Sequence, residues 1–471
     1  MSGIRVINVG LGTFLPALLD HDIPVLDVDF TVPGSGDERT LQLLKETLPY
    51  YGQVRAANER AVAALVMGQA QAVRVLPARA VLPDLEDRVI LHAGPPLTWE
   101  RACGPVRGAV MGAVMYEGWA TTPEEAAGLV ARGHVRLSPC HHHGAVGPMA
   151  GVISPSMPVW VVEDQDGRRA SATLNEGLGK VLRFGAYSPE VLARLRWIQD
   201  VLGPAIDRGL VERKGIDVKS ILSRALHMGD EGHNRNVAAT SLLVRQLAPA
   251  LAATSAGTVL GEVLAFLAGN DHFFLNLSMA AAKLAADAAA GVPWSTIVTC
   301  MSRNGTDFGL RISAMPDRWF TAPAPAVQGL YFPGYGPADA NPDLGDSAIT
   351  EVAGLGGTAM ATAPAIAQFV GGTPGDGVRT TIEMREITSG ENPSYSIPAL
   401  DFSPVPCGFD TLLICRTGIT PVINTGIAHR EAGMGQVGAG LVRAPLAPFV
   451  NALDSFVQMI KKGEFQDVAE S

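Results

Sequence analysis

Side chains able to do chemistry are concentrated in a few short, glycine-containing segments of this 471-residue chain. The densest is residues 138–151, which includes Cys140, His141, His142 and His143 followed by three glycines and one proline. Histidine exchanges protons near neutral pH, and glycine-rich backbone can turn its N–H groups toward an anion. Neighbouring histidines diverge and lack the usual zinc spacing. We predict acid–base or anion-binding use of His141 and His142 without a metal; a structural turn is the alternative.

A second dense segment, residues 227–236, brings histidines, carboxylates, an arginine and asparagines into ten positions. The predicted catalytic residues are His227, Asp230, Glu231 and His233, and the predicted substrate-binding residues are Arg235 and Asn236. Two glycines allow the sharp backbone that would make these side chains converge. A solvated loop is the alternative, but such loops are usually rich in lysine and serine. The sequence therefore predicts a site here.

Other candidates are scattered along the chain. They are the catalytic candidate His272 and the anion-binding candidates Arg107, Asn270, Arg303, Asn304, Asn424 and His429. An arginine beside an amide can hold a carboxylate, phosphate or ureido group. An Asn-Gly hairpin turn with an incidental arginine is the alternative for Arg303 and Asn304. Residues 339–347 carry three aspartates and could bind a divalent cation or form a turn network. No cofactor is predicted.

The elements that must position these segments begin with a βαβ pattern. Residues 4–9 and 25–30 are predicted strands, with a helix over residues 14–19 between them. Asp27 and Asp29 stand where a dinucleotide-binding fold has its ribose-binding acid. Position 15 is leucine instead of the third glycine of that motif. We therefore expect the fold without the dinucleotide.

The predicted fold class is α/β. It comprises a Rossmann-like domain (1–135), an α/β segment with the His-rich loop (136–215), a helical module (216–290), a C-terminal α/β domain (291–460) and a polar tail (461–471). Helices are expected over residues 37–67, 99–117 and 188–202, and within 217–290 with breaks at 228–236, Pro249 and 269–273. Strands are expected at residues 89–91, 157–163, 295–300, 311–313, 379–386, 412–415 and 421–424.

Composition limits the classes of partner. A net charge of −10 argues against nucleic acid, which needs a basic face. Five scattered cysteines without a CxxC pair are typical of a reducing compartment, so a cytoplasmic protein is expected. Only 17% of residues are charged, which indicates covered surfaces and a homo-oligomer. The most apolar stretch, residues 247–269, is interrupted by Glu262 and rich in small residues, so no membrane anchor is expected.

These segments together resemble the YlbE-type family of bacterial proteins, in order over nearly the whole chain. The resemblance covers residues 7–11, 140–151, 227–236, 269–274, 303–306, 339–347 and 424–429. One branch of that family is the AllG subunit of a three-part oxamate carbamoyltransferase of allantoin breakdown, whose partners are an FdrA-like subunit and a small third subunit. The resemblance implies phosphorolysis of oxalurate to oxamate and carbamoyl phosphate, and thus an anionic substrate and phosphate as ligands.

Two alternatives remain open at this point. The chain could be a self-sufficient hydrolase of a ureido or cyclic amide bond, with water in place of phosphate. It could also be a non-catalytic subunit that binds a small anion. The resemblance carries over no catalytic residue, so the candidates above rest on the residues alone.

Overall fold

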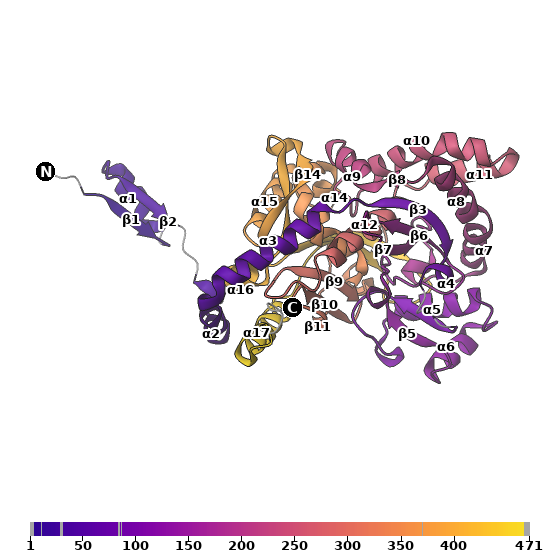
Figure 1. Ribbon diagram of the computed structural model, residues 1–471, viewed down its shortest axis with the longest axis horizontal. Helices are drawn as coiled ribbons and strands as arrows, with labels where there is room; N and C mark the ends of the chain where they lie inside the picture. The colour runs from indigo at the N-terminus through magenta and orange to yellow at the C-terminus, as the bar shows by residue number, and fades with distance from the viewer. Residues whose placement is uncertain are drawn as a thin grey trace.

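The computed structural model describes residues 4–10, 12–28, 32–82, 85, 87–369 and 371–465. Within them, short strands form six small sheets that are interleaved with helices (Figure 1). This mixture confirms the predicted α/β class. Asp29 and the end of the predicted tail, residues 466–471, lie outside the described residues.

The sheets are mostly antiparallel; only the β1–β2 and β4–β5 pairs are parallel among the described strands. The larger sheets have the orders β7-β6-β3-β8, β11-β10-β9-β13 and β12-β17-β16, and β14 pairs with β15. The strands are β1 (Val6–Val9), β2 (Val25–Val28), β3 (Gln71–Pro77), β4 (Val89–His92), β5 (Arg136–Pro139), β6 (Pro158–Glu163), β7 (Arg169–Thr173), β8 (Ile216–Asp217), β9 (Val298–Asn304), β10 (Asp307–Ile312), β11 (Met315–Pro323), β12 (Gln328–Tyr331), β13 (Leu344–Gly345), β14 (Thr388–Ile397), β15 (Ser403–Phe409), β16 (Val422–Ala428) and β17 (Gln436–Arg443).

The helices pack around and between these sheets. They are α1 (Leu15–Asp20), α2 (Glu38–Thr47), α3 (Tyr51–Met67), α4 (Ala78–Val81), α5 (Gly104–Tyr116), α6 (Pro123–Ala131), α7 (Pro189–Trp197), α8 (Gly203–Arg213), α9 (Val218–His227), α10 (Val237–Thr254), α11 (Gly257–Ala268), α12 (Leu275–Ala288), α13 (Ile349–Val352), α14 (Pro364–Phe369), α15 (Pro374–Arg385), α16 (Thr411–Thr417) and α17 (Ala447–Lys462).

Three element predictions are wrong. Residues 379–386 lie largely in α15, which begins with a capping box between Thr373 and Asp376. Residues 412–415 lie in α16, where Asp410 caps the first turn and Gly418 ends the helix in a left-handed conformation. In both cases a short apolar or β-branched run was compatible with strand and helix alike. α10 continues through Pro249 because Leu247 and Leu251, on either side of it, are both buried.

The N-terminal unit, defined here as β1, α1 and β2, stands apart from the body of the molecule (Figure 1). Its strands are parallel, with Ile7 opposite Leu26 and Val9 opposite Val28, as the βαβ pattern predicts. Asp27 accepts a hydrogen bond from the amide of Asn8 at 2.7 Å. The unit is too small to form a core of its own.

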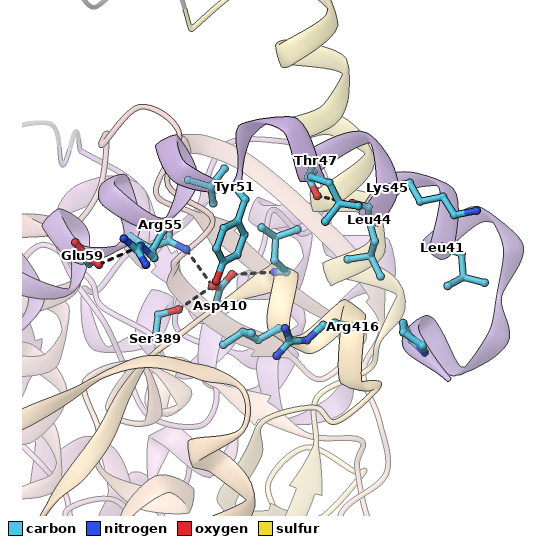
Figure 2. A pocket seen from close by; sticks show the side chains of 16 residues that line it. Leu41, Leu44, Lys45, Thr47, Tyr51, Arg55, Glu59, Ser389, Asp410 and Arg416 are labelled. Carbon is cyan, nitrogen blue, oxygen red and sulfur yellow. Dashed lines mark hydrogen bonds and ion pairs between the residues drawn. The ribbon is translucent and has the colours of Figure 1, made fainter. Parts of the chain in front are cut away.

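A cavity of about 560 Å³ lies between α2, α3 and α16 (Figure 2). Its floor is apolar, and Lys45, Arg55 and Arg416 stand around it. Asp410 lies in it but is satisfied by Asn58, among other partners, at 3.0 Å. We call this feature the α2–α3–α16 groove.

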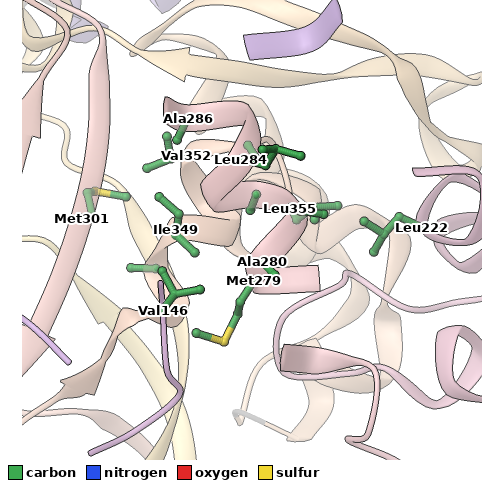
Figure 3. Close-up of a cluster of buried hydrophobic side chains, with 14 of the residues drawn as sticks. Val146, Leu222, Met279, Ala280, Leu284, Ala286, Met301, Ile349, Val352 and Leu355 are labelled. Carbon is green, nitrogen blue, oxygen red and sulfur yellow. The ribbon is translucent and has the colours of Figure 1, made fainter. Parts of the chain in front are cut away.

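The core is centred on α12, which lies inside the molecule (Figure 3). Eleven of its 14 residues are buried, including Met279, Ala280 and Leu284. A helix buried on all sides must be apolar or small-chained around its whole circumference, and α12 is rich in alanine. Its one lysine, Lys283, pairs with Asp287 at 2.5 Å. The first turn of α12 therefore has a fixed position from which a site can be built.

The main hydrophobic cluster contains residues from Leu43 to Phe465, and β3 pairs with β6 and β8 across two of the expected domain boundaries. The five-part division of the chain stays a prediction. Among the described helices, α10 alone has the length and composition to cross a membrane, and 44% of that window is buried in the structure.

Candidate functional site

A small cavity lies where the first turn of α12 meets the loop that follows the histidine run. We call it the anion cavity. Its lining combines segments distant in sequence: Pro148, Met149, Leu178, Arg183, Phe184, His233, Asn234, His272, Leu275, Ser347, Gly426 and Gln436. Its free volume is about 20 Å³, about the space of one water molecule. A larger ligand must displace a side chain, and half-exposed Leu178, between two glycines of positive φ, is placed for that.

Arg183 gives this cavity its charge. The side chain is buried, and its Nη2 and Nε donate to the carbonyl of Gly177 at 2.8 and 3.3 Å. Burial lowers the pKa of Arg183 to about 10, and the attraction of Glu176 offsets part of this effect. Within the part of the chain that the structure describes, no carboxylate forms an ion pair with this guanidinium. Because Glu176 attracts this guanidinium without forming an ion pair with it, the guanidinium can still bind an anion in the cavity.

Two buried amide atoms in the cavity lining lack hydrogen-bond partners among the described residues. They are Nδ2 of Asn234, a donor, and Oε1 of Gln436, an acceptor. Leaving a buried polar atom unsatisfied costs roughly 1–3 kcal/mol, so such atoms indicate a missing partner. An amide or ureido group supplies both a carbonyl and an N–H. The cavity thus offers a cation for a carboxylate and an amide pair for an amide.

His233 has the geometry of an acid–base residue. Its Nδ1 lies 2.8 and 3.0 Å from the two carboxylate oxygens of Glu351, which is fully buried. A carboxylate on one ring nitrogen fixes the tautomer and leaves the other nitrogen basic. His233 lines the cavity, so Nε2 is the nitrogen available there. This pair can accept and return a proton.

His272 is a second histidine of the cavity with a different character. Burial and the neighbouring charges of Arg183 and His233 lower the pKa of His272 to about 3. It is therefore neutral at physiological pH and suited to hydrogen bonding rather than to proton storage. Asn270 holds its backbone, because Oδ1 of Asn270 accepts from the N–H of His272 at 3.2 Å.

The turn that carries His233 is built around Glu231. Its carboxylate accepts from the N–H groups of His233 at 2.9 Å and Arg235 at 2.8 Å, and also from Asn234. Burial raises the pKa of Glu231 to about 7. Asn236 donates to the carbonyl of His233 at 2.6 Å. These residues position the turn and do not line the cavity.

Asp230 and Arg235 complete that turn. Asp230 accepts from the N–H of Ala239 at 2.8 Å in the first turn of α10, and its other oxygen lies 3.5 Å from Nε of Arg235. Burial raises the pKa of Asp230 to about 6. Asn424 also acts through a neighbour, since its N–H donates to Glu351 at 3.2 Å.

His141 does not line the cavity but lies beside the Asp346 turn that does. Its Nε2 is 3.4 Å from Asp346, and both side chains are buried. Burial alone would lower the pKa of His141, but Cys300 and Asp346 raise it above its usual value. Burial alone would likewise raise the pKa of Asp346, which His141 and donors from Ser302 and Gly94 hold below its usual range. Ser347, next in sequence to Asp346, lines the cavity.

The histidine loop and the Asp346 turn fit together closely. Asp346 accepts from the N–H of Gly147 at 2.9 Å, and its own N–H donates to the carbonyl of Gly147 at 3.0 Å. Gly345 has a φ of +126°, and a Cβ there would lie 2.7 Å from the nitrogen of Met149. No other residue type fits this approach without movement, so the position requires glycine.

The remaining predicted residues lie away from the cavity. The ring of His142 accepts a hydrogen bond from Trp319 at 2.8 Å, and exposed His227 is hydrogen-bonded to Ser396 at 2.8 Å. Arg107 donates to the carbonyl of Glu100 at 2.9 Å. His429 accepts from the N–H of Glu431 at 3.0 Å. Their functional roles stay predictions.

Arg303 and Asn304 occupy structural positions. Buried Arg303 pairs with Asp343 at 2.6 Å and donates to Thr425 at 3.2 Å. Asn304 begins the turn between β9 and β10, where its Oδ1 accepts from Thr306 at 3.0 Å. This is the Asn-Gly hairpin named above as the alternative. Among the aspartates of residues 339–347, Asp339 accepts from the N–H of Gly336 at 2.9 Å in a local turn, whereas buried Asp343 and Asp346 bond to Arg303 and Ser302 from distant segments.

Sequence reasoning missed Arg183, Glu351 and Gln436. Arg183 had a signal, because residues 175–185 combine Asn175, Glu176 and three glycines in the manner of the segments that were singled out. Glu351 had none, since it sits in a short apolar helix. Across the described residues, no three His, Cys, Asp or Glu side chains are grouped so that they could hold a metal ion.

Comparison with known proteins gives a consistent family. The sequence model of the family described as oxamate carbamoyltransferase subunit AllG matches residues 135–347. The Escherichia coli K12 protein described as oxamate carbamoyltransferase subunit AllG is 46% identical over 418 residues, which are 88% of this chain and 100% of that protein. The chain belongs to the AllG family.

Two further relatives of this AllG-family chain carry no assigned function. The uncharacterized protein YahG of Escherichia coli K12 is 44% identical over 456 residues, 96% of each chain. A crystal structure of a conserved protein of unknown function from Enterococcus faecalis V583 has a TM-score of 0.86 and 47% identity, covering 87% of this chain and 99% of that one.

Proposed function

We propose that this chain is a subunit of an oxamate carbamoyltransferase and that the anion cavity binds the oxamate part of its substrate. The activity is taken from the description of the Escherichia coli relative as oxamate carbamoyltransferase subunit AllG. The observation that carries the proposal is the buried, unpaired guanidinium of Arg183 beside the unsatisfied amide atoms of Asn234 and Gln436. Oxamate has a carboxylate next to a primary amide, which is the complementary set of groups.

The reaction would be oxalurate plus phosphate giving oxamate and carbamoyl phosphate. In the reverse direction the amide nitrogen of oxamate forms a bond to the carbamoyl carbon, and the bond from that carbon to the phosphate oxygen breaks. Phosphate leaves with the bonding electrons, and the amide nitrogen gives up a proton. Nε2 of His233, oriented by Glu351, is our candidate for accepting it.

Arg183 would bind the carboxylate and so place the amide next to His233. With a single guanidinium, the cavity accounts for one anion. We therefore expect carbamoyl phosphate to be held together with partner subunits, an FdrA-like subunit and a small third subunit. A place in allantoin nitrogen breakdown, with carbamoyl phosphate passed to a kinase, follows from the same reaction.

The first test is calorimetric titration of the full chain, alone and with those partner subunits, with oxamate. Arg183→Gln should weaken binding at least about tenfold, because a hydrogen bond to a charged group contributes about 1.5–3 kcal/mol. The control is Arg60→Gln, which removes an exposed guanidinium on α3 that donates to the carbonyl of Ala56, outside the cavity. Equal affinity in both variants would place oxamate elsewhere.

The second test separates transfer from hydrolysis. Oxalurate consumption by the complete complex should require phosphate and yield carbamoyl phosphate in equal amount. Consumption that proceeds without phosphate would favour the amidohydrolase alternative. Full activity of the partners without this chain would favour the non-catalytic alternative.

A further inference from the structure

One face of the N-terminal unit is apolar and uncovered. Parallel partners in register point to the same side of a sheet, and neighbours along a strand alternate. Ile7, Val9, Leu26 and Val28 therefore share one face, and they are 67%, 49%, 61% and 37% exposed. On the other face Asn8 is only 7% exposed. α1 thus covers one side of the two strands and leaves the aliphatic side bare.

A bare parallel sheet face is unusual, because parallel sheets are normally covered on both sides. Four exposed aliphatic side chains side by side form an apolar patch, and such patches mark interaction sites. Further apolar residues of the unit, Phe14 and Leu19, are 59% and 58% exposed. The unit therefore needs a partner surface.

The α2–α3–α16 groove is a surface with matching properties. Its apolar lining includes Leu41, Leu44, Leu48, Leu412 and Leu413. Leu48 is 66% exposed, so the groove is open to another molecule. Figure 2 shows Leu41 and Leu44 near Lys45, and the charged Arg55, Glu59 and Arg416 also line the groove.

The N-terminal unit as a whole and the groove carry net charges of opposite sign. Residues 4–28 carry three acidic side chains, Asp20, Asp22 and Asp27, against one arginine, Arg5. The groove has three basic side chains, Lys45, Arg55 and Arg416, against Glu59 and the internally bonded Asp410. Net charges of opposite sign favour the encounter of the two parts.

We propose that the N-terminal unit of one copy of this chain packs its bare face into the α2–α3–α16 groove of a second copy. The unit projects away from the body that carries its own groove (Figure 1). Pro33, which lines the groove, follows the unit closely in sequence. Exchange of a terminal unit between two copies is reciprocal, so one symmetric dimer fills both grooves and covers both bare faces.

The test is site-directed cross-linking between two differently tagged full-length copies. One copy carries Leu26→Cys on the bare face, and the other carries Leu48→Cys in the groove. Mild oxidation should produce a covalent dimer with both tags. The matched control replaces Leu48→Cys by Val211→Cys, which is 56% exposed on α8 outside the groove, and unsubstituted chains give the background from native cysteines.

Three results would overturn the proposal. Equal cross-linking in the control pair would mean random collision. A chain carrying both Leu26→Cys and Leu48→Cys that cross-links only within itself would mean that the unit occupies its own groove. A chain that sediments as a monomer at every soluble concentration would mean that the unit awaits a different protein.

A second measurement does not depend on cysteines. Leu26→Asp and Leu48→Asp each place a carboxylate in the proposed contact at a position that is already exposed, so the fold of the body should be unaffected. Each should raise the dimer dissociation constant at least about tenfold in sedimentation equilibrium. Val211→Asp should leave it unchanged, and an equal effect of all three would contradict the proposal.

Discussion

The proposed acid–base role depends on the short distance between the side chains of His233 and Glu351. The carboxylate at 2.8 Å orients the imidazole, much as an acidic residue orients the histidine of other acid–base pairs. Glu351 itself is held by the N–H groups of Gly357 at 3.1 Å and Asn424 at 3.2 Å. These two contacts fix the Glu351 carboxylate, so the pair needs no rearrangement before a proton transfer.

We predict that His233→Ala lowers the turnover of the complete complex by about 10²–10⁴-fold, the usual range for loss of a general acid–base group. Glu351→Gln should lower it less while leaving oxamate affinity nearly unchanged, because it disturbs orientation only. Steady-state kinetics with oxamate measure both effects. His134→Ala, at an exposed position that is not among the predicted site residues, is the control, and similar losses in all three variants would argue against a special role for His233.

Glu231 gives a pH-dependent contribution to stability. Burial raises its pKa in the folded chain to about 7 from a reference of 4.5, so the native state holds this proton more tightly than the unfolded chain. The contribution is present below about pH 4.5 and is lost as pH rises to about 7. It amounts to at most about 3 kcal/mol.

Urea unfolding at several pH values between 4.5 and 8 measures this effect. Glu231→Gln should remove that part of the pH dependence, whereas Glu124→Gln, on the exposed first turn of α6, should retain it. An unchanged slope in Glu231→Gln would show that another group is responsible.

At the scale of elements, β9, β13 and β16 are tied together by a buried ion pair. Arg303 on β9 bonds Asp343 next to β13 and Thr425 on β16. Removing one partner of a buried pair leaves an uncompensated charge and costs about 3–5 kcal/mol. We predict this loss in Asp343→Asn, measured by urea unfolding. Arg101→Gln, which breaks the exposed pair with Asp307 at 2.8 Å, should cost less than about 1 kcal/mol.

Whether a helix or strand could be predicted depends on whether its sequence signal lies within a few neighbouring residues. The βαβ unit, α5 and most helices of residues 217–290 were predictable, because periodicity and glycine turns act over a few residues. α15 and α16 were not, because their capping side chains outweigh short apolar runs that also fit a strand. The dense segment at 227–236 did contribute His233 to the cavity. Arg303 does not line the cavity, because its guanidinium is paired with Asp343. That partner lies forty residues further along the chain, so no local pattern predicts the pair.

At the scale of the whole molecule, the anion cavity has walls from the loop after the histidine run, the turn before α10, the start of α12 and strand β17. No local pattern predicts that these meet. The glycine-containing segment of Arg183 carried a local signal, but the role of this residue depends on neighbours from distant segments that only the fold brings together.

We predict that oxamate protects all these walls at once. Hydrogen–deuterium exchange of the full chain should slow over residues 147–149, 175–185, 232–235 and 436–438 together, because the ligand would contact each. Arg183→Gln should abolish the protection without changing exchange in α12. Slower exchange confined to one segment would contradict a composite cavity.

The burial of α12 bears on the order in which the chain is made. This helix touches sheet strands that precede it and the short helix α13 that follows it, so during synthesis it leaves the ribosome before part of its surroundings exists. Gln436, the last residue of the cavity lining in sequence order, emerges after all the others. Until then the nascent chain exposes the apolar, alanine-rich surface of α12 and has an incomplete cavity. We therefore expect a chaperone that binds α12 until residue 436 has left the ribosome to assist folding.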